Sequence, residues 1–169
     1  YSARMSRKAA REIWIDTPRS VVSNTPAATA KAVVVPGGFR VTGRQPFSTG
    51  CMHASWIAAH AQVIENGEVR RRDGKPEVRY CLVPRAHVEI IDAWHTKGMR
   101  GTGTHSFDVK DVFVPEERTV FPYGAPIVSP GPRYKIPLTL GFGAGDGMVA
   151  LVGQWWLDNR ALRNARCRQ

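Results

Sequence analysis

The residues best suited to chemistry in this sequence lie in one short stretch, Pro46-Phe47-Ser48-Thr49-Gly50. An aromatic ring and two hydroxyl groups follow one another between two apolar segments that resemble strands. Such a corner can hold a flat ligand with polar edges, with Phe47 against its face and Thr49 hydrogen-bonded to an edge atom. The same stretch is compatible with a plain hairpin that buries the ring and caps its turn with a hydroxyl. On its own, therefore, it leaves both interpretations open.

The segments around this corner predict a mainly β domain that would position it. Six stretches are rich in β-branched and apolar residues: 33–35, 39–42, 56–63, 78–83, 88–91 and 107–114. Gly-Gly, Asn-Gly and Asp-Gly pairs at 37–38, 66–67 and 73–74 supply turns between them. Gly43 is expected to close the strand before the corner. Several short strands with such turns are typical of an antiparallel β-barrel or sandwich.

The last of these strands shows the alternation of a pleated strand with one face buried. Alternation places Phe107, Val109 and Asp111 on one face, and Val112 and Val114 on the other. We therefore expect the two sets to face opposite sides of the sheet.

Both ends of the chain read as helical. Residues 6–15 predict a short helix capped by Ser6. Its apolar residues share one face: Ala9, Ala10, Ile13 and Trp14. After a Pro/Gly-rich linker near 122–132, apolar residues recur at helical spacing to the end of the chain. We expect four parts: 1–19, 20–120, 121–137 and 138–169.

Composition sets bounds on the class of protein. The chain has 169 residues, 43% hydrophobic and 22% charged, which is enough for one domain with a proper core. It lacks the apolar run of about 18 residues that a membrane span requires. Cys51, Cys81 and Cys167 have no paired spacing, so neither a disulfide framework nor a zinc site is expected. A reducing cytoplasm fits this cysteine usage, and the start at Tyr1 suggests a fragment.

The net charge of +10 raises the possibility of a nucleic-acid partner. The basic residues form two dense groups, Arg70-Arg71-Arg72 and four arginines between 160 and 168. The first group adjoins Asp73-Gly74 and reads as a solvated hairpin loop. Because solvated charge runs are common, we do not expect nucleic acid as the partner, although a basic binding fragment without catalytic activity stays a rival interpretation.

Five segments in order carry a resemblance to a known family: 36–39, 40–63, 82–85, 94–104 and 111–115. The fourth reads W-H-T-K-G-M-R-G-T-G-T and the fifth reads D-V-F-V-P. Together they resemble the middle β-domain of the acyl-CoA dehydrogenase superfamily, in the branch of two-component flavin-dependent monooxygenases that hydroxylate aromatic compounds. The resemblance covers roughly residues 20–120. It makes 1–19 a remnant of an N-terminal helical domain and 138–169 the start of a C-terminal one.

The resemblance implies that the full-length protein is an oxidoreductase. It implies reduced flavin, FMN or FAD, delivered by a separate flavin reductase, an aromatic substrate that takes up oxygen, and a homo-oligomer. An acyl-CoA dehydrogenase, which takes a hydride from an acyl thioester, is the rival within the superfamily. Phe47, where those enzymes usually carry Trp, and the corner at 100–103 favour the hydroxylase.

Site residues follow from the same resemblance. Phe47 matches the aromatic residue beside the flavin ring, and Thr49 matches the hydroxyl residue near flavin N5, with Ser48 adjacent. Arg100 is a candidate for flavin phosphates, or only shapes the fold, and His53 is a candidate for the flavin or substrate side, or is only solvated. The family's general base comes from its C-terminal helices, and nothing in this sequence matches it. Ala30 stands where a glycine is common, which weakens the expected close approach of that loop to flavin.

Overall fold

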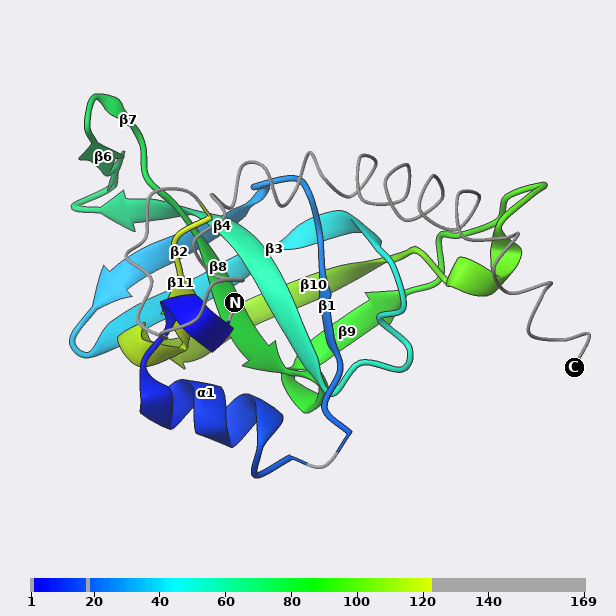
Figure 1. The fold of residues 1–169 in the computed structure, drawn as a ribbon. Helices are drawn as coiled ribbons and strands as arrows, with labels where there is room; N and C mark the ends of the chain where they lie inside the picture. The colour runs from blue at the N-terminus through cyan, green and yellow to red at the C-terminus, as the bar shows by residue number, and fades with distance from the viewer. Residues whose placement is uncertain (1, 18, 123–169) are drawn as a thin grey trace, which may run out of the picture. The chain divides into compact units, whose positions relative to one another are not determined.

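The computed structural model describes residues 2–17 and 19–122, which form a mainly β fold with one α-helix (Figure 1). The chain divides into two compact units, 1–129 and 130–169, and all described residues belong to the first. The linker and helix predicted between 122 and the end of the chain lie outside the described residues, apart from Pro122. No helix among the described residues is long and apolar enough to cross a membrane.

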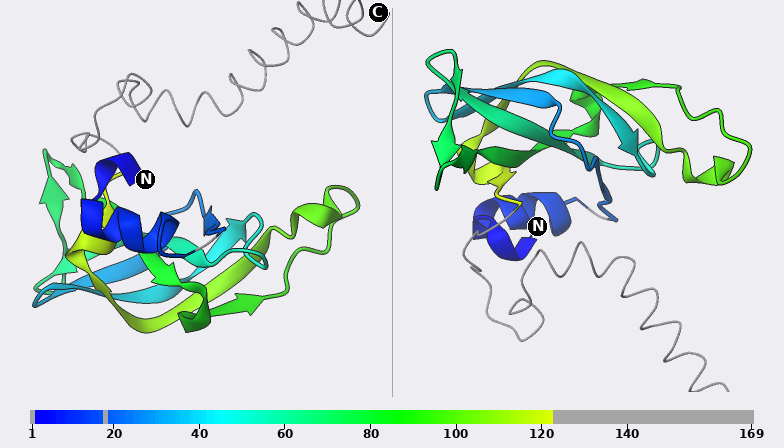
Figure 2. Two further views of the ribbon diagram at one scale, coloured as in Figure 1. Left: turned by 60° about the horizontal axis from the view of Figure 1, so that its bottom comes forward. Right: turned by 90° about the horizontal axis from the view of Figure 1, so that it is seen from above.

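The N-terminal segment forms the helix that the sequence predicts. A short 3-10 turn, η1 (Ser2–Arg4), precedes α1 (Arg7–Trp14). The side chain of Ser6 accepts a hydrogen bond from Ala9 N at 3.1 Å and caps α1. The predicted apolar face is confirmed, because Ala9 and Ile13 are buried and Trp14 packs beside them. The helix lies against one face of the sheet (Figure 2).

Eleven strands occur within the described residues. They are β1 (Val22–Asn24), β2 (Ala30–Val35), β3 (Gly38–Ser48), β4 (Trp56–Glu65), β5 (Glu68–Val69), β6 (Arg71–Arg72), β7 (Lys75–Pro76), β8 (Val78–Pro84), β9 (Val88–Ile91), β10 (His105–Pro115) and β11 (Thr119–Val120). All six predicted strand segments coincide with observed strands. Three further 3-10 turns are η2 (Arg85–His87), η3 (Arg100–Thr102) and η4 (Glu116–Arg118).

The strands form one large mixed sheet and one small hairpin. The order in the large sheet is β11-β8-β4-β2-β3-β10-β9, and β1 and β5 also pair with β4. Most pairs are antiparallel, but β1 and β2 run parallel to β4. The mainly β prediction is therefore confirmed, while the sheet stays open instead of closing into an antiparallel barrel. β6 and β7 form the exposed hairpin expected at 70–75, and Arg70 beside it forms an ion pair with Glu77 at 2.8 Å.

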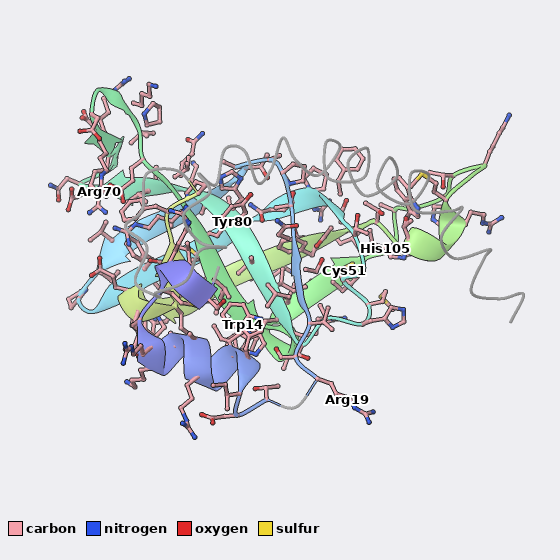
Figure 3. The ribbon with its side chains drawn as sticks, viewed as in Figure 1. Trp14, Arg19, Cys51, Arg70, Tyr80 and His105 are labelled. Carbon is pink, nitrogen blue, oxygen red and sulfur yellow. The ribbon has the colours of Figure 1, made fainter. Side chains whose placement is uncertain are left out.

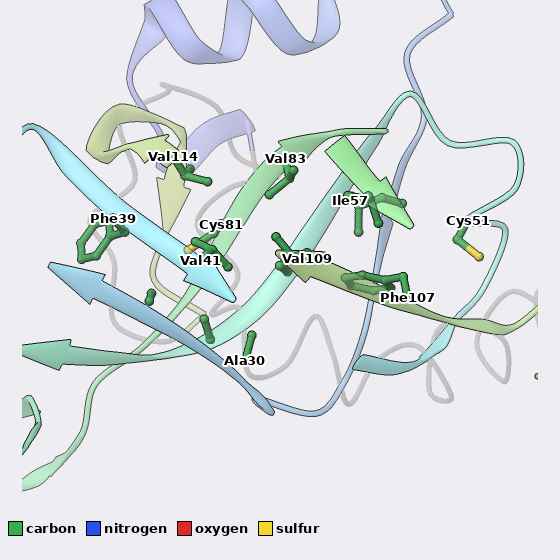
Figure 4. Close-up of a cluster of buried hydrophobic side chains, with 14 of the residues drawn as sticks. Ala30, Phe39, Val41, Cys51, Ile57, Cys81, Val83, Phe107, Val109 and Val114 are labelled. Carbon is green, nitrogen blue, oxygen red and sulfur yellow. The ribbon is translucent and has the colours of Figure 1, made fainter. Parts of the chain in front are cut away.

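The core lies inside the curve of the large sheet. Side chains from β2, β3, β4, β8, β9 and β10 meet there, and Figure 4 shows Val41, Ile57, Val83 and Phe107 among them. β4 is buried on both faces, because Ile57 points into this core and Trp56 packs in the cluster that includes α1. This explains why 56–63 reads as a nearly continuous apolar run.

Strand β3 continues through the residue that was expected to end it. It runs to Ser48 and so carries the chain directly into the corner. Gly43 makes this possible at the crossing with β2, because a Cβ there would lie 2.7 Å from Ala30 Cα. The prediction that the strand ends at Gly43 is therefore wrong. Gly43 lies within β3, where the absence of a side chain allows β3 and β2 to pack closely.

The predicted alternation in β10 fails after Val109. Phe107, Val109 and Val114 are all buried in the same core, so Val114 does not face the opposite side. The register against β3 shifts between Val109 and Val112, and Asp111 has φ of 51°. An inserted residue of this kind reverses the parity of the strand. A regular period of two cannot reveal such a bulge.

Candidate functional site

The polar corner after β3 meets a loop that is distant in sequence, the connection between β9 and β10. The backbone N–H of Gly50 donates to the carbonyl of Thr102 at 3.0 Å. The thiol of Cys51 lies 3.7 Å from the carbonyl of Gly103. Figure 3 labels Cys51 and His105 at this meeting of the two segments. The fold thus brings together two of the stretches that the sequence singled out.

Phe47 projects from the corner towards solvent. Its side chain is 57% exposed, and its backbone has φ of 59°. A positive φ is uncommon for a bulky residue, so the surrounding strand pairing must hold this conformation. The ring meets Trp94 of the β9–β10 connection edge to face, with centroids 6.5 Å apart. The two segments therefore present a supported aromatic surface.

Thr49 is exposed beside this ring and belongs to a row of three threonine hydroxyls. Its Oγ1 lies 3.1 Å from Oγ1 of Thr104, which lies 2.7 Å from Oγ1 of Thr102. Thr102 in turn donates to the carbonyl of Met99 at 2.8 Å. The resemblance made Thr102, with Arg100, part of a corner that either contacts flavin phosphates or only shapes the fold, whereas Thr104 was not expected as a site residue. Only the folded structure shows that they reach Thr49.

Ser48 faces the other way. Its side chain is fully buried, and its Oγ lies 2.7 Å from Oγ of Ser23 on β1. Ser23 also donates to the carbonyl of Thr49 at 2.7 Å. Ser48 and Ser23 thus fasten the corner to β1 from beneath. No sequence pattern indicated Ser23, because β1, with three residues, is too short to show one.

Arg100 and His53 both lie near the corner with exposed side chains. Among the described residues neither side chain forms an ion pair or a hydrogen bond. Arg100 is the first residue of η3. Because its guanidinium has no partner among the described residues, it can bind an anionic group. Met52 and Met99 are also exposed here, by 56% and 75%. The corner is therefore an open surface of mixed apolar and polar character.

A hollow of about 370 Å³ adjoins the corner. Its lining comprises Met52, Arg85, Val88, Ile90, Asp92 and His105. Asp92 is the unexpected member: its carboxylate lies 3.1 Å from Nδ1 of His105 and 3.6 Å from Nε2 of His95. Sequence reasoning found no partner for either histidine, since an exposed aspartate in a loop carries no distinguishing signal.

Thiol and metal chemistry find no support within the described residues. Burial raises the pKa of the Cys51 thiol, and it raises the pKa of Cys81 to about 12. Both cysteines are buried and free, so neither is a ready thiolate. No group of three metal-ligating side chains occurs in this part of the chain.

Comparison with known proteins shows which family the chain resembles. The chain is 34% identical over 156 residues to a pigment production hydroxylase of Rhodococcus sp. (strain ATCC 21145), covering 88% of this chain and 38% of that protein. It is 36% identical over 145 residues to the flavin-dependent monooxygenase oxygenase subunit HsaA of Mycobacterium tuberculosis, covering 81% and 35%. The crystal structure of the HsaA monooxygenase superposes with a TM-score of 0.62 at 38% identity, covering 71% of this chain and 30% of that one.

Over most of its length the chain is similar to oxygenase subunits of two-component flavin-dependent monooxygenases, and it has an acyl-CoA dehydrogenase-like fold. It spans little more than a third of the curated relatives it matches. A further solved structure, XiaF from Streptomyces sp. in complex with FADH2 and glycerol, superposes with a TM-score of 0.62 at 36% identity, covering 71% of this chain and 29% of that one. No family model matches the chain. The resemblance inferred from five sequence segments is confirmed at the level of the monooxygenase branch.

Proposed function

We propose that residues 20–120 form the flavin-binding β-domain of a reduced-flavin-dependent monooxygenase that hydroxylates an aromatic substrate. The proposal includes a flavin reductase as partner, a homo-oligomer and a cytoplasmic location. Residues 1–19 would then be the remnant of an N-terminal helical domain, 121–137 a linker, and 138–169 the start of a C-terminal helical domain.

One observation carries the proposal: an exposed aromatic ring and an exposed hydroxyl lie two positions apart where β3 ends, and both contact the β9–β10 connection. Phe47 is held outward by its left-handed backbone and by contact with Trp94. Thr49 is fixed from beneath by Ser23 and from the side by Thr104. A flat ring with polar edge atoms, such as a flavin, fits one wall of this kind. The residues present therefore suit reduced FMN or FAD.

Each residue then has a distinct part in binding. Phe47 packs against the ring face, and Thr49 bonds a polar edge atom. Arg100 is the candidate for phosphate oxygens, because it is exposed and without an acidic partner among the described residues. Ser48 has a supporting part, because its buried hydroxyl is hydrogen-bonded to Ser23 and holds the corner in place. His53 is the candidate for the substrate side.

The chemistry itself belongs to the cofactor. When bound, reduced flavin would supply the electrons that activate molecular oxygen for transfer to the substrate. The residues of this chain orient the ring and keep water from one of its faces. We assign no general base among the described residues, because the resemblance places the family's general base in its C-terminal helices.

The test is an anaerobic titration of the purified chain with reduced FMN and reduced FAD, followed by flavin absorbance and fluorescence. We expect saturable binding of at least one reduced flavin, weakened by Phe47→Ala and by Thr49→Val. Phe113→Ala is the matched control, because Phe113 is similarly exposed, at 45%, but lies at the opposite end of β10. Absence of binding would overturn the proposal for this chain. Reduction of bound oxidised flavin by an acyl-CoA would point to a dehydrogenase instead.

A further inference from the structure

The hydrogen bonds along the row of threonine hydroxyls beside the corner all run in one donor-to-acceptor direction. It runs from exposed Thr49 through Thr104 and Thr102, both half-buried, to the carbonyl of Met99. Contacts of 3.1, 2.7 and 2.8 Å join the successive oxygens. All of these contacts lie within hydrogen-bonding range. Within the described residues, the three hydroxyls have no other hydrogen-bond partner.

A threonine hydroxyl has one proton to donate and two lone pairs that accept. The Met99 carbonyl can only accept, so Thr102 donates its proton there. Were that proton turned elsewhere, two oxygens would face each other at 2.8 Å with no proton between them. Thr104 must therefore be the donor to Thr102, and Thr49 the donor to Thr104. The proton of Thr49 is thus directed into the protein.

The acceptor at the end of this row is held firmly. Besides Thr102 Oγ1, the Met99 carbonyl accepts Trp94 Nε1 at 3.0 Å and the Thr102 backbone N–H at 3.1 Å. The first of these bonds orients the same tryptophan that supports Phe47. The aromatic surface and the polarity of the hydroxyl row therefore share one anchor.

We propose that Thr102 and Thr104 are positioning residues that make Thr49 a hydrogen-bond acceptor, and not a donor, towards the ligand at the corner. The inference rests on the proposed function and deepens it. With its proton held by Thr104, Thr49 offers only lone pairs to the outside. It favours a ligand edge that carries an N–H and disfavours an edge that carries a lone pair.

This polarity distinguishes the two redox states of a flavin. The central ring nitrogen N5 carries a hydrogen in reduced flavin and a bare lone pair in oxidised flavin. Thr49 can accept from the first, whereas the second would set two lone pairs against each other. The hydroxyl row thereby selects the reduced cofactor without any charged group. The net contribution of a typical hydrogen bond is modest, so we expect a several-fold preference from this source.

The test compares affinities for oxidised and reduced FMN, the latter measured anaerobically, across matched variants of the purified chain. Thr104→Val keeps the side-chain shape but removes the acceptor, which frees the Thr49 proton. We expect the ratio of oxidised to reduced dissociation constants to fall about fivefold. Thr104→Ser retains the hydroxyl and should keep the wild-type ratio. Thr17→Val, at the end of α1, is the control for a threonine substitution away from the row.

The outcomes separate the inference from the proposed function. Binding of reduced FMN with a ratio that Thr104→Val leaves unchanged would overturn the inference and leave the function standing. Failure of the wild-type chain to bind either form would overturn the proposed function.

The polarity itself has a readout that needs no flavin. Neutron diffraction from deuterium-exchanged crystals should show the Thr49 deuteron directed at Thr104 Oγ1. A Thr104 deuteron directed at Thr49 would refute the inference whatever the flavin titration gives. This measurement also covers the case in which a Thr104 variant fails to fold.

Discussion

His60 shows how burial at one residue sets a pH dependence for the whole domain. Its side chain on β4 is 6% exposed, and its ring stacks on Tyr80 with centroids 4.3 Å apart. Nδ1 lies 3.2 Å from the carbonyl of Pro26, whereas Nε2 is buried and has no hydrogen-bond partner within the part of the chain that the structure describes. A second proton would place an unpaired charge in the interior, so burial lowers the pKa of His60 below its ordinary 6.5.

The sign of the effect follows from this lowered pKa. The unfolded chain binds a proton near pH 6.5, while the folded chain resists it to lower pH. The contribution of neutral His60 to the unfolding free energy is therefore fully present above pH 6.5. It decreases as the pH falls below 6.5, and it stops decreasing once the pH is below the folded-state pKa. We expect urea unfolding at pH 7.5 and 5.5 to show a drop in unfolding free energy of up to about 1.4 kcal/mol per pH unit.

A comparison of variants assigns that drop to His60. His60→Gln removes the titrating group and should flatten the dependence, even if it lowers stability at both pH values. His87→Gln is the control, because His87 is exposed on η2. An equal pH dependence in wild type and His60→Gln would show that another group is responsible.

At the scale of elements, the site depends on how β1 is fastened beneath the corner. β1 has only three residues, yet Ser23 on it contacts both Ser48 Oγ and the Thr49 carbonyl at 2.7 Å. Because the carbonyl can only accept, Ser23 donates to it and Ser48 donates to Ser23. Ser23 and Ser48 are both buried, so removing one member leaves a polar group without its partner.

A double-mutant cycle measures this fastening. We expect Ser23→Ala to lower the unfolding free energy by about 1–3 kcal/mol, the cost of burying an unsatisfied group. Ser48→Ala alone should cost less, because Ser23 keeps its acceptor. The double variant should be less destabilised than the sum of the two, since the residues share one hydrogen bond. Ser2→Ala, at an exposed serine of η1, is the control. Additive losses would mean that the two serines act separately.

At the scale of the molecule, local pattern predicted the long elements but not their long-range partners. The helix at 6–15 and the six strand segments were predictable because burial of one face imposes a period on the sequence. The parallel pairing of β1 and β2 with β4 and the bulge at Asp111 were not. Those features depend on contacts between residues far apart in the chain.

The candidate site likewise has residues that local sequence indicates and residues that only long-range contacts bring together. Phe47 and Thr49 were proposed as site residues from residue type, because an aromatic and a hydroxyl in a turn suggest a ligand, and their role stays a prediction. Their supports, Ser23 and Thr104, lie 26 and 55 positions from Thr49, and no local signal connects them. Sequence thus suggests candidate ligand-binding side chains more readily than the residues that orient them.

The sheet order leads to a prediction about which part of the chain folds by itself. Strand β10 pairs with both β3 and β9, and it contributes Phe107, Val109 and Val114 to the core. Burial of three such side chains contributes about 1.5–3 kcal/mol each, against a total stability of about 5–15 kcal/mol for a domain. A chain cut after residue 129, the end of the first unit, should therefore unfold cooperatively, whereas a chain cut after residue 104 should not.

Tryptophan fluorescence in urea measures the difference, because buried Trp56 is present in both shortened chains. A sigmoidal transition is expected for residues 1–129, and a gradual change without a baseline for residues 1–104. A gradual change for both would mean that the core described here needs residues beyond 129 for its stability. In that case weak flavin binding by the shortened chain would reflect unfolding and would carry no information about Phe47 or Thr49. The unfolding transition is therefore also the control for flavin binding by any shortened chain.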